Sequence, residues 1–79
     1  MNIEELKKDM LGSGSNIGFI YNGKNCGIES EFKDGTPTFE VWYGNDIKTH
    51  NEFDTMIYDK FFGGQSLADL LNKIDIDFY

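Results

Sequence analysis

The dipeptide Asn22-Gly23 constrains the fold of this 79-residue chain more than any other feature of its sequence. It joins two short segments, residues 17–21 and 24–28, that have the alternating pattern of a half-buried hairpin. Asn-Gly is a strong hairpin signal because a type I′ turn requires a positive φ at both central residues. The turn fixes the register, and the pairs that we expect to face the core are Ile17–Ile28, Phe19–Cys26 and Tyr21–Lys24. The opposite face carries Gly18, Ile20, Asn25, Gly27 and Glu29.

Two further turns are predicted to continue this hairpin as a meander. Residues 33–37 form the first, in which Asp34-Gly35 supplies the bend and Pro37 cannot donate to a strand ladder. Residues 38–43 then alternate in polarity. Their core-facing set is Phe39, Val41 and Tyr43, and their outward set is Thr38, Glu40 and Trp42. After a turn at residues 44–46, residues 47–50 are predicted to add a short fourth strand, and a meander of this kind is antiparallel and exposed on one face.

An N-terminal helix is indicated by Asn2, an N-cap residue that is followed three positions later by the capping-box acid Glu5. Apolar residues then recur at helical spacing, at Ile3, Leu6, Met10 and Leu11. We expect the helix to end at Gly12, because the sequence of residues 12–16 predicts a flexible joint. Such a joint is too short to separate two domains, so residues 1–79 are predicted to form a single domain.

The hydrophobic period becomes helical again after residue 52. A short helix is predicted to begin near Asp54 and to end at Gly63-Gly64, and its apolar residues are Phe53, Met56, Ile57 and Phe61. Ser66 is predicted to cap another helix with Asp69 at the capping-box position, and its apolar stripe is Leu67, Leu70, Leu71 and Ile74. Residues 74–79 alternate as a final strand, with Ile76 and Phe78 inward and Asp75 and Asp77 outward. The chain is thus predicted to be an α+β domain with its helices on one side of an antiparallel sheet.

The charge balance is strongly acidic, with fourteen carboxylates against seven lysines, no arginine and a net charge of −7. A nucleic-acid-binding protein needs a basic footprint, so direct binding to nucleic acid is excluded. No apolar run approaches the roughly 18 residues of a membrane-spanning helix, so no membrane association is expected. The first residues lack the basic and apolar regions of a signal peptide, and the single Cys26 cannot form an internal disulfide. Both features favour a cytoplasmic protein.

Four segments carry a resemblance that extends over most of the chain. They are Tyr21–Lys24, Glu52–Asp54, Phe62–Leu70 and Ile74–Asp77. In these segments the chain resembles small acidic proteins that are carried by phages and mobile elements of low-GC Gram-positive bacteria. The resemblance implies an inhibitor of host defence nucleases, of the type to which anti-CRISPR proteins belong. It carries over no catalytic residue.

The sequence lacks the residue combinations that catalysis requires, so we expect no enzymatic activity and no cofactor. The only histidine, His50, is expected on the surface, and Cys26 is expected in the core as a small hydrophobe. No P-loop or dinucleotide-binding fingerprint is present. Metal binding stays open as an alternative, because Asp75 and Asp77 would lie about 6.6–6.8 Å apart on one strand face. Carboxylates in such an arrangement can hold Mg²⁺ or Ca²⁺.

Seven outward residues form the candidate binding surface. They are Glu29, Glu31, Asp34, Glu40, Trp42, Asp75 and Asp77. Carboxylates at regular strand spacing can take the positions of phosphates in a basic groove, and tryptophan is enriched at interface hot spots. Two alternatives remain open: the charge serves solubility alone, or a helix covers this face and Trp42 belongs to the core.

Two functions follow from these features. The first is a non-enzymatic inhibitor that presents a DNA-mimicking acidic sheet face to a basic protein with a nucleic-acid-binding groove, such as a nuclease. The second is a self-associating or scaffolding module, for example a homodimer, that uses an edge strand or its apolar helix faces. The first predicts binding that weakens with salt, and the second predicts binding that hardly depends on salt.

Overall fold

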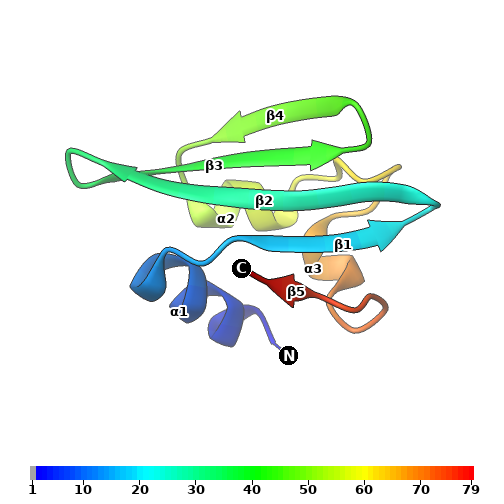
Figure 1. Cartoon of the computed structure of the whole chain (residues 1–79), viewed down its shortest axis with the longest axis horizontal. Helices are drawn as coiled ribbons and strands as arrows, with labels where there is room; N and C mark the ends of the chain where they lie inside the picture. Colours follow the sequence, from blue (N-terminus) through cyan, green and yellow to red (C-terminus); the bar gives the residue numbers. More distant parts are fainter. Residues whose placement is uncertain (1) are drawn as a thin grey trace.

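Five strands and three helices form the fold of residues 2–79, the part of the chain that this computed structural model describes (Figure 1). The strands are β1 (Ile17–Tyr21), β2 (Lys24–Lys33), β3 (Thr36–Tyr43), β4 (Asp46–His50) and β5 (Asp77–Phe78). The helices are α1 (Ile3–Ser13), α2 (Phe53–Tyr58) and α3 (Leu67–Leu70). All strand pairs are antiparallel, in the order β4-β3-β2-β1-β5. The predicted α+β class is confirmed.

The first hairpin has the register that its turn predicted. Ile17 lies opposite Ile28, Phe19 opposite Cys26, and Tyr21 opposite Lys24. Both turn residues have positive φ, 54° at Asn22 and 70° at Gly23, as a type I′ turn requires. The face that we expected to be apolar therefore points into the core, where Ile17, Phe19, Cys26 and Ile28 are buried.

The second hairpin is longer than predicted. Its turn consists of Asp34 and Gly35 alone, with φ of 53° and 78°, so β2 runs to Lys33 and β3 starts at Thr36. Pro37 was expected in the turn, but it lies within β3, opposite Phe32. In a two-residue hairpin the pair next to the turn is hydrogen-bonded and the following pair is not. Pro37 occupies that second pair, so its missing N–H removes no bond between β2 and β3.

Helices α1 and α3 begin at their predicted caps, and α2 begins at Phe53, one residue before the predicted Asp54, but all three helices end elsewhere than predicted. The side chain of Asn2 accepts a hydrogen bond of 2.8 Å from the backbone N–H of Glu5, and α1 ends at Ser13, one residue beyond the predicted end. Helix α2 ends at Tyr58, so Phe61 lies in the following turn rather than on a helical stripe. Helix α3 has the predicted capping box between Ser66 and Asp69 but stops after four residues. Tight turns bring the remaining apolar residues into contact with the core without further helix.

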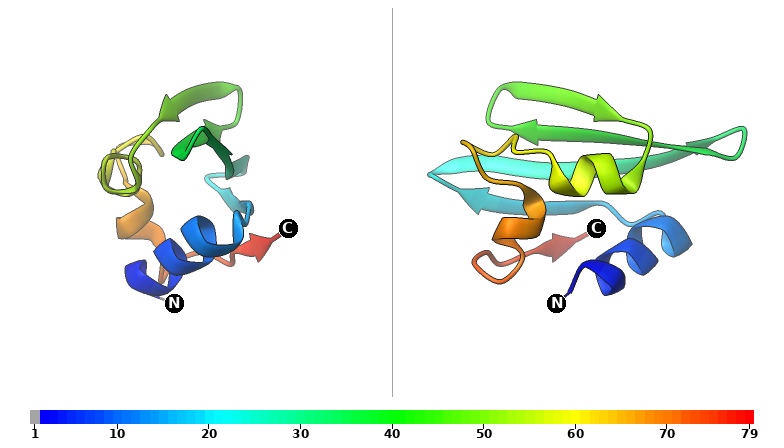
Figure 2. Two further views of the ribbon diagram at one scale, coloured as in Figure 1. Left: turned by 90° about the vertical axis from the view of Figure 1, so that its left-hand side faces the viewer. Right: turned by 180° about the vertical axis from the view of Figure 1, so that it is seen from behind.

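All three helices lie on the same face of the sheet, which we call the inner face (Figure 2). The buried residues of the inner face are Ile17, Phe19, Cys26, Ile28, Phe39, Val41 and Tyr43. The buried helical residues are Leu6, Met10, Phe53, Met56, Ile57, Leu67 and Leu70. Phe62, from the turn after α2, completes this core, with its ring centroid 5.3 Å from that of Phe19 and 6.0 Å from that of Tyr43.

Strand β5 pairs with β1 at the edge of the sheet. Ile17 lies opposite Phe78 and Gly18 opposite Asp77, so Asp77 faces outward as predicted. The strand itself has only two residues, whereas residues 74–79 were predicted to form it, and Asp75 precedes it in the chain. Asn16 and Tyr79 extend this pairing, because each backbone N–H donates to the other residue's carbonyl oxygen, at 3.0 and 2.9 Å. Within the described part of the chain, no helix combines the length and apolar character needed to cross a bilayer.

Candidate functional site

The sheet face opposite the helices, here called the outer face, is open (Figure 2). Its apolar side chains are correspondingly exposed: Ile20 retains 62%, Ile47 64% and Tyr79 63% of its accessible surface. Trp42 lies on this face, opposite Gly27 and Ile47 in the neighbouring strands. The alternative in which a helix covers Trp42 is therefore wrong, because the three helices pack against the inner face.

Three of the predicted acids come together on the outer face of β2 and β3. Glu29 lies directly opposite Glu40, and Glu31 lies opposite Thr38. These residues line a shallow hollow between the strands. We call Glu29, Glu31 and Glu40 the carboxylate cluster. Asp34 lies apart from it, in the exposed turn at the tip of the β2–β3 hairpin.

Cations are scarce around the carboxylate cluster. The ion pairs among residues 2–79 are Lys7–Asp54, Lys48–Asp59, His50–Asp59 and Lys60–Asp69, and none includes a cluster residue. The strand lysines Lys24 and Lys48 lie opposite Tyr21 and Val41, on the inner side of the sheet. Lys33, beside the hairpin turn, is the one strand lysine that alternation places on the outer face within the described chain. The cluster thus presents a nearly uncompensated negative charge.

Next to the cluster, two glycines leave a bare strip of backbone across β1 and β2. Gly18 lies directly opposite Gly27. A methyl group on Gly27 would overlap the indole ring of Trp42 and lie 2.5 Å from the carbonyl oxygen of Ile17. A methyl group on Gly18 would lie 3.4 Å from Cε1 of Tyr79. The two aromatic side chains therefore lie close over the glycine backbone.

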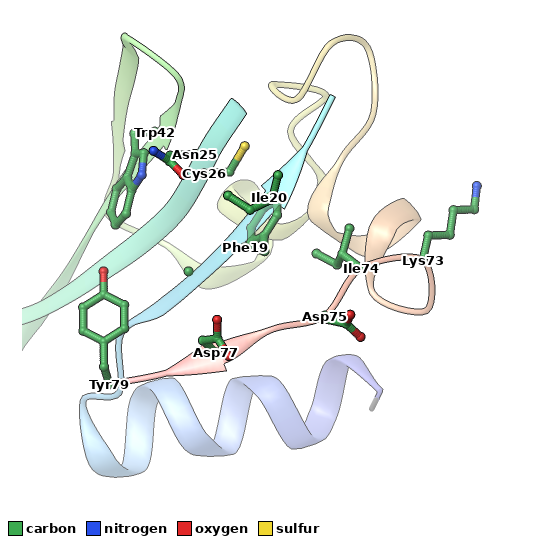
Figure 3. Close-up of a pocket in the computed structure, with 11 residues that line it drawn as sticks. Phe19, Ile20, Asn25, Cys26, Trp42, Lys73, Ile74, Asp75, Asp77 and Tyr79 are labelled. Carbon is green, nitrogen blue, oxygen red and sulfur yellow. The ribbon is translucent and has the colours of Figure 1, made fainter. Parts of the chain in front are cut away.

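An open groove of about 580 Å³ adjoins this strip at Gly18. We call it the aromatic groove; Gly18, Ile20, Trp42 and Tyr79 line it. Figure 3 shows Trp42 and Tyr79 at one end of the groove and the Lys73 side chain at the other. The carboxylates of Asp75 and Asp77 lie between these ends. The groove thus combines aromatic walls with two acids.

The structure distributes the seven predicted residues over two adjoining patches and one turn. Glu29, Glu31 and Glu40 form the carboxylate cluster, while Trp42, Asp75 and Asp77 line the aromatic groove. Asp34 belongs to neither patch. Glu29 follows Gly27 by two residues on β2, so the patches adjoin on one face.

Tyr79 is a groove residue that the sequence reasoning missed. The signal for it was present, because the alternation that placed Asp75 and Asp77 outward places Tyr79 on the same side. The predicted register also set Gly18 opposite Gly27, which exposes backbone where an aromatic ring can approach closely. Ile47, opposite Trp42, was likewise not recognised as part of this face.

His50 is not the solvated surface residue that we expected. Its side chain keeps only 13% of its accessible surface, and its Nε2 lies 3.0 Å from Oδ2 of Asp59. The ammonium of Lys48 contacts the same oxygen at 2.7 Å. The hydrogen bond from Lys48 is the main cause that lowers the pKa of the Asp59 carboxyl, which is therefore held as a carboxylate between two nitrogen groups. This trio joins β4 to the end of α2.

Cys26 lies in the core, as predicted, with 2% of its surface exposed. Burial raises the pKa of its thiol, which disfavours the reactive thiolate. Within residues 2–79 there is no group of three or more histidine, cysteine, aspartate or glutamate side chains placed to hold a metal ion. The side chains that the outer face presents include carboxylates and aromatic rings.

Comparisons with protein-family models, with curated proteins and with solved structures found no significant match to this chain.

Proposed function

We propose that this protein is a non-enzymatic inhibitor that binds, through its acidic outer face, the nucleic-acid-binding groove of a basic host protein. The partner class is a nucleic-acid-binding defence protein, such as a nuclease. In this role the protein belongs with the small acidic inhibitors of phages and mobile elements, the anti-CRISPR type included. It works in the cytoplasm and replaces DNA rather than binding it.

The observation that carries this proposal is the direct opposition of Glu29 and Glu40 on β2 and β3. Like charges at opposite positions of an antiparallel pair destabilise a sheet by roughly 0.2–1 kcal/mol. No ion pair of the described residues relieves this repulsion. A solubilising charge has no need of such a position, because the exposed helix surface offers others. The cations of a basic partner would pair with these carboxylates and relieve the repulsion between them.

The spacing of the carboxylate cluster also suits a phosphate mimic. Glu29 and Glu31 are two residues apart on one strand, which separates them by about 6.8 Å. The phosphates of one DNA strand follow a helical path, so neighbouring phosphates lie well farther apart in space than their rise of about 3.4 Å along the helix axis, and the Glu29–Glu31 spacing is comparable to that of neighbouring nucleotides. Glu40, one strand further, adds a second row about 5 Å away. The carboxylates of the cluster are therefore hydrogen-bond acceptors for lysine and arginine side chains that bind a phosphate backbone.

A capture experiment with a charge-matched control tests this function. The wild-type protein, immobilised, is exposed to a lysate of a low-GC Gram-positive bacterium at about 50 and 500 mM NaCl. We expect it to retain a nucleic-acid-binding protein at low salt, to lose it at high salt, and to release it when duplex DNA is added. The triple variant Glu29→Gln, Glu31→Gln, Glu40→Gln should retain little of that protein.

The control variant removes three charges elsewhere: Glu4→Gln, Asp46→Asn and Glu52→Gln. These residues are exposed, lie off the outer face and take part in no ion pair of the described chain. We expect this variant to capture the same protein as the wild type. Equal capture by both variants, with circular dichroism showing both folded, would rule out the carboxylate cluster as the binding surface.

Self-association is the second candidate, and strand β4 is the feature that favours it. This strand ends the sheet and leaves one backbone edge without a neighbouring strand among residues 2–79, while Ile47 on it is largely exposed. Such an edge can pair with the same edge of a second copy. Sedimentation equilibrium decides between the two functions. A dimer that persists in high salt and is lost in Ile47→Lys supports self-association, and a monomer at all concentrations supports the inhibitor.

A further inference from the structure

We propose that the aromatic groove receives an arginine side chain of the basic partner, with the guanidinium group lying against Trp42 and Tyr79 and paired with Asp77. This inference rests on the proposed function and names the chemical group that the outer face recognises. It treats the groove as a specific receptor beside the less selective carboxylate cluster.

The walls of the groove suit a planar cation. Trp42 and Tyr79 both line it, and Figure 3 shows them at the same end. A guanidinium group stacks on aromatic faces and gains roughly 0.5–1 kcal/mol there at exposed sites. Neither ring is paired with another aromatic ring among the described residues, whereas the aromatic pairs of the core are formed by phenylalanines and Tyr43. Both rings therefore remain available to a ligand.

Glycine shapes the surface beneath the two aromatic rings. Gly18, which lines the groove, faces Gly27 across β1 and β2, and neither residue brings a Cβ atom between the rings. Trp42 lies so close over Gly27 that no other residue fits there without displacing the indole ring. At Gly18 a methyl group would only touch Tyr79. Gly18→Ala should therefore narrow the groove while the sheet stays intact.

The charge of the groove also favours a cation. Asp75 and Asp77 line it against a single ammonium group, that of Lys73. Lys73 lies at the end away from Trp42 and Tyr79 (Figure 3), so the aromatic end has the acids as its nearest charges. A carboxylate can accept two parallel hydrogen bonds from a guanidinium but not from an ammonium group, so arginine is the better ligand. Residues 1–79 contain no arginine, so none of these residues supplies the guanidinium group.

Titration with two short peptides tests this inference. The probes are acetyl-(Gly-Arg)₃-amide and acetyl-(Gly-Lys)₃-amide, which carry the same charge. Binding is followed by the NMR signals of the Trp42 indole N–H and the backbone amides of Gly18 and Gly27 in the ¹⁵N-labelled protein. We expect the arginine peptide to shift these three signals and to bind roughly threefold or more tightly than the lysine peptide. Gly18→Ala and Tyr79→Leu should each remove that preference for arginine.

Two results separate failure of the groove from failure of the proposed function. If both peptides bind equally and shift only the signals of Glu29, Glu31 and Glu40, the groove is not an arginine site, while the acidic face can still bind a basic partner. If the arginine peptide binds the groove but duplex DNA never competes with the captured protein, the arginine site stands and DNA mimicry is wrong. The wild-type titration requires no variant, so a folding defect in Gly18→Ala or Tyr79→Leu cannot obscure the first result.

Discussion

Glu29 and Glu40 lie directly opposite each other on β2 and β3, and neither takes part in an ion pair of the described chain. Their side chains point away from the core, to the sheet face that the helices leave open. A protein optimised for stability alone would place a cation at one of these positions. We therefore expect that a change of charge on the outer face weakens the binding of the basic partner. The same change should raise the free energy of unfolding of the protein.

The substitution Glu40→Lys separates these two effects. It turns a repulsive cross-strand pair into an attractive one, so it should raise the free energy of unfolding by about 0.5 kcal/mol. Urea denaturation measures this change. Capture of the basic partner should fall at the same time. If Glu40→Lys destabilises the protein, the Glu29–Glu40 repulsion is not a cost of the native state.

Gly27→Ala and Gly18→Ala form a matched pair on adjacent strands. An alanine at residue 27 would meet the carbonyl oxygen of Ile17 and the indole ring of Trp42, so we expect a loss of about 1–3 kcal/mol. Alanine at residue 18 makes ordinary contact with Tyr79 and should change stability by less than about 0.5 kcal/mol. Denaturant unfolding compares the two. Equal effects would contradict the close approach of the Trp42 ring and of the Ile17 carbonyl oxygen to Gly27.

Asp59 should make stability depend on pH. The hydrogen bond from Lys48 is the main cause that lowers the pKa of Asp59 in the folded protein. The stability that the Asp59 carboxylate contributes is therefore present above the pKa of the unfolded state and is lost as the pH falls through the pKa of the folded state. Asp59→Asn should cost about 1 kcal/mol at pH 7, measured by urea denaturation. The difference in the free energy of unfolding between Asp59→Asn and the wild type should shrink below about pH 4.

Asp54→Asn, which affects only an exposed ion pair, serves as the control and should cost less than about 0.5 kcal/mol. A difference that is constant from pH 7 to pH 2 would contradict this role of Asp59.

The capping box of α3 gives a prediction for the helical side. The Ser66 hydroxyl oxygen accepts from the N–H of Asp69, and the Asp69 carboxylate accepts from the N–H of Ser66. Ser66→Ala should cost about 1 kcal/mol, measured by thermal or urea unfolding.

The hydrogen bonds from Lys60 and Ser66 lower the pKa of Asp69 to about 2, and an NMR titration of its carboxyl should find this value in the wild type. The value should be higher in Ser66→Ala. An unchanged pKa would mean that the Ser66 hydroxyl does not help to lower it, because alanine keeps the backbone N–H that donates to the carboxylate.

The sequence predicted the parts of the fold that local chemistry determines. Asn22-Gly23 allowed one turn type, and that turn determined which residues of β1 and β2 meet. Asn2 and Ser66 marked the starts of α1 and α3 because their side chains accept from the first free N–H groups. The outward positions of Glu29, Glu31 and Glu40 followed from strand alternation once the register was known.

Features that depend on tertiary contact were not predictable in the same way. The burial of Phe62, beyond the end of α2, depends on Phe19 and Tyr43, which are far from Phe62 in the sequence. His50 was expected in solvent because nothing in the sequence near it reveals the approach of Asp59. The aromatic groove likewise requires β5 to dock beside β1, which brings Tyr79 next to Gly18.

Displacement of DNA from the captured partner tests DNA mimicry by the outer face most directly. The purified partner is bound to a fluorescent DNA duplex, and fluorescence anisotropy follows the release of the duplex as this protein is added. We predict full displacement by the wild type and by the control variant with Glu4→Gln, Asp46→Asn and Glu52→Gln. The triple variant with Glu29→Gln, Glu31→Gln and Glu40→Gln should need roughly tenfold more protein. A ternary complex that holds the duplex and this protein together, or equal displacement by the two triple variants, would contradict the proposed function.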